Sequence, residues 1–415
     1  MKLPIKILIV SDNPTGFTGY GNQTRGLAAR LAKDPIFEVV FLGCQNHNSN
    51  ETWLDLTDFN NMSISEYKRI NCIRYLGSGF RPYPSDVLQE ILDREKPDIL
   101  FILLDSFMLY SNPWGWITNI QIAPTKFVMY FPSDGYPFPL HCEEVLKKAD
   151  VRVAMSKFAQ RQVIDQFGLD DTLYIPHAVD PNQFYPLNET MKQENINYWS
   201  KRLNYDFRNK FIIGAVARNQ GRKMWDRTFR TLGEWNKKYS HDDWIFIAHC
   251  DFHDPANHLN IIEIIKRFKL EGKVIWDGTK VFKGFNTIEM NYLYNLFNLQ
   301  FFMSSGEGFG IPFIESMACE IPNLIPAFTS PIELVGENKE RGILIEVKDF
   351  MIGTWNVDRG LANVEDAVEK LEYCYNHREE LKLMGKRGRE EVLKYYSWDV
   401  VFPQFKQLFE EIVLK

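Results

Sequence analysis

Short hydrophobic segments alternate with longer segments of helical periodicity along the whole chain of 415 residues. This alternation is typical of parallel sheets covered by helices, because the connection between two parallel strands has to cross one face of the sheet. In the first half of the chain, the pattern predicts strands near 5–10, 37–43, 98–104, 127–131, 150–154 and 172–175, with helices between them such as 22–33 and 85–95.

The alternation pauses at residues 187–210, a polar stretch rich in Asn, Lys and Glu. Such a stretch is typical of the boundary between two domains. We therefore expect two doubly wound α/β domains of similar size, with a ligand cleft between them beyond the carboxyl ends of the strands. The second series predicts strands near 211–217, 244–249, 273–276, 299–303 and 323–326, helices near 224–238, 259–268, 287–297, 312–319, 363–376 and 378–394, and a last helix from Ser397 to about Leu414.

Residues 304–322 carry the most informative motif of the chain. The predicted strand 299–303 leads into a glycine-rich loop, and Pro312 then opens a helix. Proline suits the first turn of a helix, because its missing N–H would have no partner there. The backbone N–H groups at a helix start, together with the helix dipole, favour the binding of an anion such as phosphate.

Two carboxylates, Glu307 and Glu315, flank this expected anion site. Carboxylates repel a phosphate group that binds alone. A ligand with both a diphosphate and hydroxyl groups fits better, because the carboxylates accept hydrogen bonds from the hydroxyls while backbone N–H groups bind the phosphates. The motif therefore indicates a nucleotide-sugar.

Arg218 and Lys223 lie just beyond the predicted strand 211–217. An arginine fork and a lysine point charge at the carboxyl end of a strand suit a diphosphate. Taken alone, the two residues fit a solvated basic loop better than a binding site. Their position favours the functional interpretation, since the same edge of the same predicted sheet carries the loop with Glu307.

A second glycine-rich loop, residues 16–21, follows the first predicted strand and precedes a helix. It either lets a phosphate or sugar approach the backbone closely or forms a tight strand-to-helix turn. Its glycine spacing differs from that of dinucleotide-binding loops. Both interpretations stay open, with Gly16 and Gly19 as candidate donor-binding residues.

Asp134 follows the predicted strand 127–131 and precedes a glycine between two prolines. An aspartate at this position can orient a hydroxyl group or accept a proton. An Asp-Gly pair beside prolines is also ordinary β-turn chemistry. Asp134 is therefore a candidate catalytic residue with a structural alternative.

A cluster of histidines and aspartates resembles a metal site at first sight. The segment, however, leaves a strand end and enters a proline-containing loop, where polar residues gather for other reasons. No cysteine or acidic partner at a defined distance completes a ligand set, so we expect no metal there. The cluster comprises His249, Asp251, His253, Asp254 and His258.

The composition narrows the classes of function. A net charge of −6 gives no strong signal for binding to nucleic acid or anionic lipid. The six cysteines are scattered without paired spacing, which favours a reducing compartment over a disulfide framework. The N-terminal hydrophobic run is too short for a signal peptide, and no run reaches the length of a membrane span. We therefore expect a cytoplasmic protein.

Taken in their order along the chain, these motifs resemble the family-four retaining glycosyltransferases, the group 1 glycosyltransferases of GT-B fold. The resemblance covers nearly the whole chain, and the early glycine loop and the terminal helix with Trp398 fit it as well. The further motifs that carry it are residues 174–180 with Phe184 and Pro186, Arg218 with Lys223, the pair Glu307 and Glu315, Glu333–Gly336 and Arg341–Leu344.

The resemblance implies two Rossmann-like domains that face a central cleft. Residues 1–190 form the acceptor-side domain, which the terminal helix 397–415 crosses back to complete. Residues 191–396 form the domain that binds the nucleotide-sugar donor.

The resemblance also implies roles for individual residues. Arg218 and Lys223 hold the donor diphosphate and offset the charge that develops as it leaves. Glu307 contacts hydroxyls of the transferred sugar, and Glu315 contacts those of the ribose. The amides of Gly308, Phe309 and Gly310 lie near sugar and phosphate. Many relatives place a first-domain histidine beside the sugar, where this chain has Asp134.

We therefore expect a metal-independent enzyme without a bound cofactor, for which a nucleoside-diphosphate sugar is the co-substrate. It would transfer a hexose to a hydroxyl acceptor, on a glycan, a lipid-linked molecule or another class, with retention of the anomeric configuration. The expected location is the cytoplasm, with peripheral contact to the inner face of a membrane as an option. Two alternatives stay open, a sugar-nucleotide epimerase of the same architecture and a non-catalytic nucleotide-sugar-binding subunit.

Overall fold

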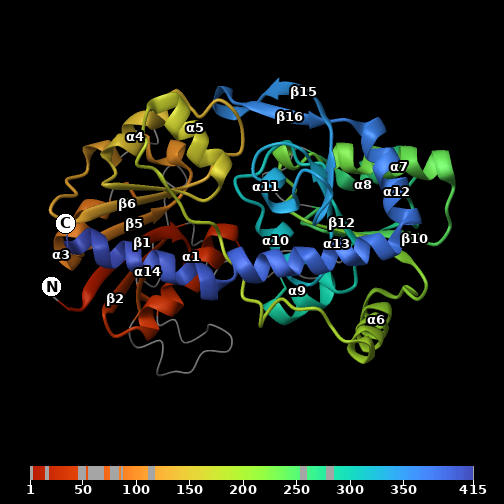
Figure 1. Ribbon diagram of the computed structural model, residues 1–415, viewed down its shortest axis with the longest axis horizontal. Coiled ribbons are helices and arrows are strands. Elements are labelled where there is room, and N and C mark those ends of the chain that lie inside the picture. The colour runs from red at the N-terminus through yellow and green to blue at the C-terminus, as the bar shows by residue number, and fades with distance from the viewer. Residues whose placement is uncertain are drawn as a thin grey trace. The chain divides into compact units, whose positions relative to one another are not determined.

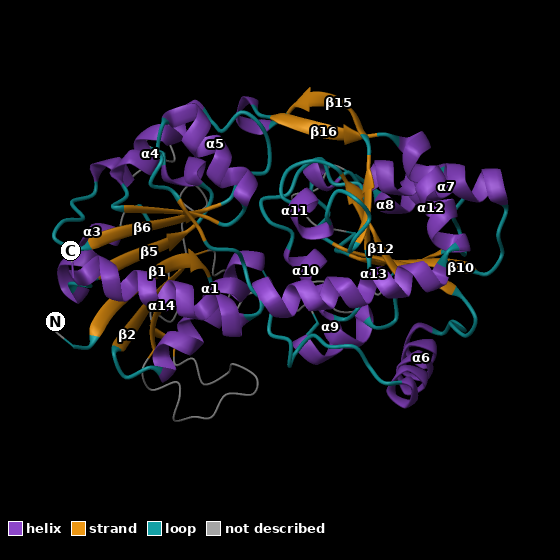
Figure 2. Cartoon of the chain, viewed as in Figure 1, coloured by secondary structure: helices purple, strands orange, loops and turns teal. Residues whose placement is uncertain are grey.

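The chain divides into two compact units in the computed structural model. The first unit contains Met1–His177 and Trp398–Lys415, and the second contains Ala178–Ser397. Each unit is built around a sheet with helices on its faces (Figures 1 and 2), so the predicted α/β class with two doubly wound domains is confirmed. The structure describes residues 3–14, 18–44, 53–54, 70–74, 84–85, 87–110, 117–252, 259–276 and 285–414.

An eight-stranded sheet forms the core of the first unit, in the order β3-β4-β2-β1-β5-β6-β7-β8. Neighbouring strands are parallel except β3 and β4, which are antiparallel. The strand order reverses between β1 and β5, which makes their carboxyl ends the switch point of this sheet. The strands are β1 (Ile5–Asp12), β2 (Phe37–Cys44), β3 (Trp53–Leu54), β4 (Ile70–Arg74), β5 (Ile99–Leu103), β6 (Lys126–Phe131), β7 (Val151–Ala154) and β8 (Leu173–Tyr174).

Side-chain caps fix where two helices of the first unit begin. Thr18 accepts a hydrogen bond from the backbone N–H of Gly21 and opens α1, and Ser156 accepts one from Ala159 and opens α5. Each cap provides a partner for an N–H group that the helix itself leaves unpaired. The helices are α1 (Gly19–Lys33), α3 (Leu88–Glu95), α4 (Glu143–Lys148) and α5 (Lys157–Phe167).

The C-terminal helix α14 (Trp398–Leu414) completes the first unit. Its buried Phe405 and Phe409 pack edge-on against Phe101 of β5, with ring centroids 5.8 and 5.6 Å apart. At its start, Trp398 lies so close to α1 that a Cβ on Gly26 would meet the indole ring at 2.6 Å. Figure 1 shows α14 running beside α1.

A six-stranded parallel sheet forms the core of the second unit, in the order β11-β10-β9-β12-β13-β14. The order reverses between β9 and β12, so the carboxyl ends of these two strands form the switch point of this sheet. The strands are β9 (Phe211–Val216), β10 (Trp244–His249), β11 (Val274–Ile275), β12 (Leu299–Phe301), β13 (Asn323–Pro326) and β14 (Gly342–Ile345). The unit also contains an antiparallel hairpin of β15 (Val347–Ile352) and β16 (Asp358–Ala362). Its helices include α7 (Trp225–Tyr239), α8 (Ile261–Arg267), α9 (Thr287–Tyr294), α10 (Ile311–Ala318), α11 (Pro331–Val335), α12 (Val364–Asn376) and α13 (Arg378–Glu391).

The polar stretch 187–210 is not the boundary that its composition indicated. Most of it forms helix α6 (Glu189–Leu203), which is part of the second unit, and the chain divides at His177 and Ala178 rather than near residue 190. Two contacts attach α6 to α9: the Asn195 side chain donates to the carbonyl of Tyr292 at 2.8 Å, and Arg202 pairs with Glu289 at 3.1 Å. Only two α6 residues are buried, Asn195 and Trp199, so the helix looks polar in sequence.

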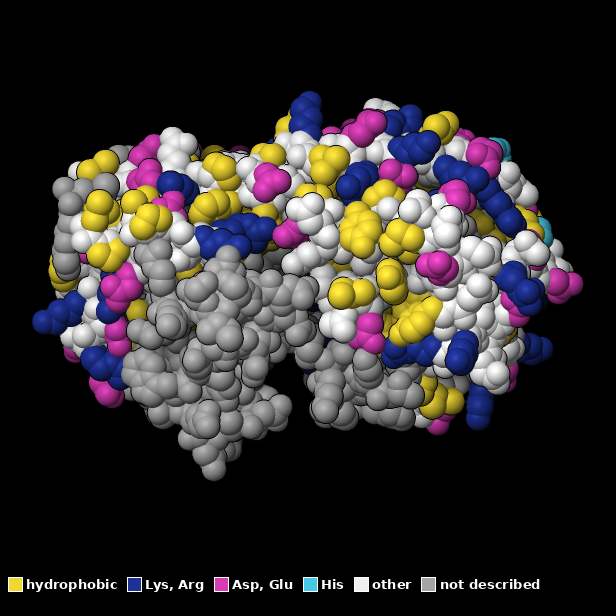
Figure 3. All heavy atoms as spheres, turned by 90° about the horizontal axis from the view of Figure 1, so that it is seen from below, with side chains coloured by type: hydrophobic (Ala, Val, Ile, Leu, Met, Phe, Trp, Pro, Cys, Tyr) yellow, Lys and Arg dark blue, Asp and Glu magenta, His cyan; other side chains and the backbone are white. Residues whose placement is uncertain are grey.

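The surface mixes charges of both signs. On the face shown in Figure 3, the Lys and Arg side chains of the described residues are interspersed with Asp and Glu, as the modest net charge of −6 suggests. Within the described ranges, no helix combines the length and the apolar character needed to cross a membrane.

Candidate active site

The candidate site lies at the switch point of the second unit's sheet. One site loop, residues 217–224, follows β9, and the other, residues 302–310, follows β12, its neighbour in the sheet. The backbone N–H of Ser305 donates to the carbonyl of Arg222 at 2.8 Å and so joins the two loops. Adjacent strands thus bring together residues that are far apart in sequence.

The loop after β9 turns sharply before α7 begins. Residues Gly221–Lys223 form a short 3-10 turn, and Met224 then adopts the left-handed conformation with φ of 48°. The indole N–H of Trp225, the first residue of α7, donates to the carbonyl of Arg218 at 3.1 Å. Because Trp225 is fully buried, this bond fixes the backbone from which the Arg218 side chain extends.

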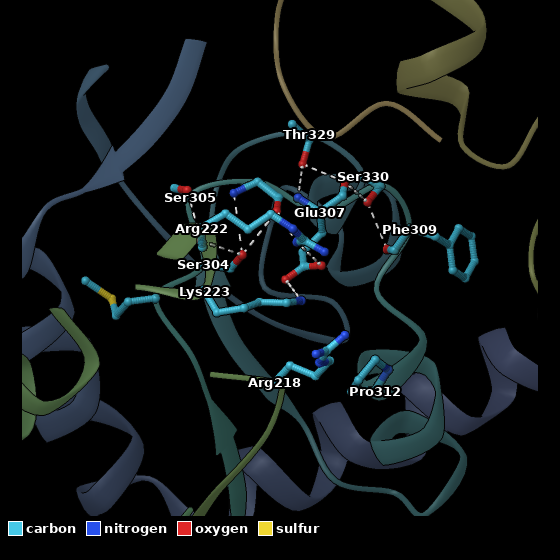
Figure 4. A network of polar contacts seen from close by, with 12 residues as sticks. Arg218, Arg222, Lys223, Ser304, Ser305, Glu307, Phe309, Pro312, Thr329 and Ser330 are labelled. Carbon is cyan, nitrogen blue, oxygen red and sulfur yellow. Dashed lines mark hydrogen bonds and ion pairs between the residues drawn. The ribbon is translucent and has the colours of Figure 1, made fainter. Parts of the chain in front are cut away.

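Hydroxyl groups from the loop after β13 hold the backbone around Glu307. The Thr329 hydroxyl accepts from the Glu307 N–H at 3.0 Å and donates to the Glu307 carbonyl at 2.9 Å. The Ser330 hydroxyl lies 2.8 Å from the carbonyl oxygens of both Glu307 and Phe309. Figure 4 shows this network on one side of the loop and the Glu307 side chain on the other.

The Glu307 carboxylate is buried between two cations. Its Oε1 lies 2.5 Å from Lys223 Nζ, and its Oε2 lies 3.1 Å from Arg222 Nη1. Only 7% of the Glu307 side chain and 11% of the Lys223 side chain are exposed. Burial alone would raise the pKa of Glu307, but the charges of Lys223 and Arg222 outweigh it and lower the pKa to about 2. Glu307 is therefore ionised throughout the physiological pH range.

The structure brings together three of the residues that the sequence assigned to the donor site. Lys223 and Glu307 are in contact, and the Arg218 side chain points toward the same region as the Lys223 ammonium group (Figure 4). Arg222, which the sequence pattern did not single out, completes the cluster. Its position next to Lys223 was the one signal in the sequence for this role, since a tight turn can direct two consecutive side chains to one side.

Glu315 has a different environment from Glu307. It lies on α10, where the Tyr294 hydroxyl of α9 donates to its Oε2 at 2.7 Å. Burial raises the pKa of Glu315 to about 7, and the hydrogen bond from Tyr294 opposes this effect only in part. The residue as a whole is only partly buried, but its carboxyl group is buried enough for its pKa to be raised.

The glycine-rich loop leads directly into α10, as the sequence indicated. Gly310 is the residue before the helix and has a left-handed backbone with φ of 102°, and Pro312 lies in the first turn. A Cβ at Gly310 would lie 2.4 Å from the Phe313 ring. Residues Gly308, Phe309 and Gly310 therefore lie directly before a helix start, a position at which backbone amides can bind an anion.

The other candidate residues belong to the first unit. Gly16 lies outside the described residues. Gly19 is the first residue of α1. Asp134 follows β6 and is half-buried, in a loop whose Gly135 carbonyl accepts from the Ser133 hydroxyl at 3.1 Å and from Gln162 at 3.0 Å. Asp134 thus occupies a carboxyl end of the first sheet, whereas the cations and the two glutamates belong to the second unit.

The histidine and aspartate cluster after β10 gives no metal site in the described part of the chain. His253, Asp254 and His258 lie outside the described residues. The ring of His249 lies 4.6 Å from that of Phe285, between centroids. Across the residues that the structure describes, no three His, Cys, Asp or Glu side chains are grouped so that they could hold a metal ion.

A protein-family model matches the part of the chain that contains the second site loop. Residues 266–391 match the model of the family described as glycosyl transferases group 1, and the match includes both Glu307 and Glu315. The predicted resemblance to the group 1 glycosyltransferases is confirmed. One curated relative, the N-acetyl-alpha-D-glucosaminyl L-malate synthase of Bacillus anthracis, is 26% identical over 160 residues. This match spans 39% of the present chain and about a third, 36%, of that relative's length.

Solved structures with a similar fold cover nearly all of the chain. Sucrose-phosphate synthase of Thermosynechococcus elongatus superposes with a TM-score of 0.74 at 16% identity, covering 98% of both chains. A glycosyltransferase of Rickettsia africae gives 0.68 at 17% identity, covering 99% of this chain and 98% of its own. HepE of Anabaena, solved in complex with UDP and glucose, gives 0.68 at 14% identity, covering 98% and 100%. The predicted GT-B fold is confirmed.

Proposed function

We propose that the protein is a retaining glycosyltransferase that transfers a hexose from a nucleoside-diphosphate sugar to a hydroxyl acceptor. The observation that carries this proposal is the cluster of Lys223, Arg222 and Glu307, with Arg218 beside it, at the switch point between β9 and β12. Ligands of open α/β sheets bind at such switch points. The cluster combines cations for phosphates with a carboxylate for hydroxyls.

In this proposal, the donor lies along the carboxyl edge of the second sheet. Arg218 and Lys223 bind the diphosphate and stabilise the charge that develops on it as the bond to the sugar breaks. Glu307 accepts hydrogen bonds from hydroxyls of the transferred hexose, and its low pKa keeps it in the accepting form. The amides of Gly308, Phe309 and Gly310 face sugar and phosphate, and Glu315 accepts from the ribose hydroxyls.

In this proposal, the first unit binds the acceptor. Asp134, at the carboxyl end of β6, orients the attacking hydroxyl group. The leaving phosphate takes the proton of that hydroxyl on the same face of the sugar, so the anomeric configuration is retained. Lys223 and Arg218 supply the positive charge that this step needs, which is why we propose a metal-independent reaction. We further propose a cytoplasmic location, for which the scattered cysteines are the support.

The experiment incubates the protein with UDP-, GDP-, ADP- and TDP-hexoses and a pool of hydroxyl acceptors, and NMR of the product gives its anomeric configuration. UDP-sugars come first, because the Anabaena structure contains UDP and glucose. We expect one donor to be consumed only with an acceptor, and Glu307→Ala and Lys223→Ala to lower the rate by orders of magnitude. Arg208→Ala, which alters an exposed ion pair with Asp206 in the same unit, serves as the matched control.

The same experiment separates the alternatives. An epimerase would convert the nucleotide-sugar without any acceptor. A non-catalytic subunit, which the aspartate at position 134 favours, would bind the nucleotide-sugar and consume none. Wild-type activity in both Glu307→Ala and Lys223→Ala would refute the site as proposed.

A further inference from the structure

Arg222 holds the loop that carries Glu307 through both its backbone and its side chain. Its carbonyl accepts from the Ser305 N–H at 2.8 Å and from the Ser305 hydroxyl at 2.9 Å. Its guanidinium Nη1 donates to the carbonyl of Gly306 at 2.9 Å and to Glu307 Oε2 at 3.1 Å. The Ser304 hydroxyl also donates to the Arg222 carbonyl at 3.4 Å. A single residue therefore connects the loop after β9 to four consecutive residues of the loop after β12 (Figure 4).

In the proposed function, Lys223 interacts with two anionic groups. It is paired with Glu307, yet it is also the residue assigned to the donor diphosphate. A lysine is a compact charge on a flexible stem and can turn toward a phosphate. When it does so, Glu307 loses one of its two cations while it remains almost completely buried. A buried carboxylate that loses its counter-charge either takes up a proton or moves.

Arg222 can supply the positive charge that Glu307 needs when Lys223 turns toward the diphosphate. Its guanidinium keeps its charge at any pH in the protein's range, and its planar fork can hold two acceptors in fixed positions. It is anchored by a hydrogen bond to the carbonyl of Gly306, the residue before Glu307, and so is tied to the loop that carries Glu307. With 33% of its side chain exposed, it lies nearer the solvent than Lys223 does.

From this arrangement, and on the basis of the proposed function, we infer that Arg222 is a positioning residue of the donor site. It keeps the Glu307 carboxylate ionised and in place for the sugar hydroxyls while Lys223 serves the diphosphate. The pKa of Glu307, which the charges of Lys223 and Arg222 lower against the effect of burial, agrees with this role. Arg222 and Lys223 are adjacent in sequence and similar in charge, but their functions differ.

The test compares Arg222→Gln, Arg222→Lys and Lys223→Gln with the wild type, using UDP binding by calorimetry and turnover of the UDP-sugar that the wild type consumes. For Arg222→Gln we expect UDP affinity close to that of the wild type and a kcat lower by about tenfold or more, since preorganised charge in an active site typically has effects of this size or larger. The acid limb of its kcat profile should move to higher pH, and Arg222→Lys should restore part of kcat. Lys223→Gln should instead weaken UDP binding.

A second measurement needs no turnover. Hydrogen exchange of the peptide that covers residues 304–310 should be faster in Arg222→Gln than in the wild type, and unchanged in the surface variant Arg208→Gln. Loss of UDP affinity as large as that of Lys223→Gln would make Arg222 a phosphate ligand and overturn the inference. So would an Arg222→Gln variant with wild-type kcat and exchange, although the proposed function would then stand. If the wild type binds and consumes no nucleoside-diphosphate sugar, the proposed function fails and this role fails with it.

Discussion

Lys223 Nζ lies 2.5 Å from Glu307 Oε1, so the cation proposed for the diphosphate and the carboxylate proposed for the sugar are paired with each other. This pairing offsets part of the cost of burying both charges, because only 7% of the Glu307 side chain and 11% of the Lys223 side chain are exposed. It also means that a donor has to compete with Glu307 for Lys223. In the proposed function, a nucleotide-sugar compensates for this competition, because its phosphate oxygens accept from the lysine and its hydroxyls donate to the glutamate.

The first prediction concerns Lys223. Replacement by Gln should weaken UDP binding and lower kcat/KM by about 100-fold or more, since removal of one preorganised charge-stabilising group typically costs a few kcal/mol in the transition state. Glu307 keeps Arg222 as a partner in this variant, so the fold should persist. Calorimetry with UDP and initial rates with the UDP-sugar provide the measurement. The exposed pair of Lys238 with Glu369 supplies the matched control, Lys238→Gln. Equal losses in both variants would point to a general charge effect instead.

The second prediction concerns the pH dependence of stability at Glu307. Its pKa is about 2 in the folded protein against an ordinary value of 4.5, so the folded state favours the ionised form. The resulting stabilisation is fully present above pH 4.5 and is lost as the pH falls toward 2. A shift of this size corresponds to about 3 kcal/mol.

Urea unfolding of the wild type and of Glu307→Gln between pH 7 and pH 3 measures this effect. The difference in unfolding free energy should be largest near neutral pH and should shrink below pH 4.5. A difference that stays constant with pH would show that the charge of Glu307 contributes nothing and that only its packing matters.

The third prediction concerns the pair Tyr294 and Glu315. Because burial raises the pKa of Glu315 to about 7, a fraction of the carboxyl groups is protonated at neutral pH and cannot accept from two ribose hydroxyls. The Tyr294 hydrogen bond favours the ionised form, so Tyr294→Phe should raise the pKa of Glu315 further. UDP affinity of this variant should therefore be reduced near pH 7 and should approach the wild-type value near pH 9. A deficit that is independent of pH would contradict this explanation.

The stability of the protein should respond to Glu315 with the opposite sign from Glu307. A carboxyl group with a raised pKa takes up more protons in the folded state than in the unfolded state between its ordinary value of 4.5 and about 7. Its contribution to the free energy of unfolding consequently falls as the pH rises through this window. Carboxyl groups whose pKa is perturbed in this way are common in functional sites.

The regular elements around the site could be predicted from hydrophobic patterns. The segments predicted at 244–249 and 323–326 coincide with β10 and β13, and the glycine loop does lead into α10. These predictions succeed because strands buried on both faces are continuous hydrophobic runs. The sequence pattern did not predict helix α6, because this helix lacks the hydrophobic run that marks a buried element. It buries only two of its residues, so its sequence carries almost no periodic signal.

The contacts within the site could be predicted only in part. The sequence indicated that Arg218, Lys223 and Glu307 share one sheet edge, since carboxyl ends of adjacent parallel strands meet there. It could not show that Lys223 and Glu307 touch, because that depends on side-chain rotamers. The Tyr294 hydroxyl that reaches Glu315 comes from a different helix, whose orientation toward α10 is set by tertiary packing.

The last prediction concerns the turn at Gly310. Its φ is 102°, and a Cβ added there would lie only 2.4 Å from the Phe313 ring, so an alanine would be both strained and crowded. We expect Gly310→Ala to lower the free energy of unfolding by about 1–3 kcal/mol. The variant should also weaken donor binding, because the turn that presents the loop amides would have to change.

Gly221, in the other site loop, is the matched control. A Cβ at Gly221 has nothing within 4 Å, and its backbone is outside the left-handed region. Gly221→Ala should therefore leave stability unchanged or raise it by up to about 1 kcal/mol, since alanine restricts the unfolded chain. Urea unfolding of both variants measures the contrast. Equal stability of the two would mean that the loop before α10 relaxes at little cost, and the backbone amides of Gly308 to Gly310 would then be too loosely held to form a preorganised phosphate site.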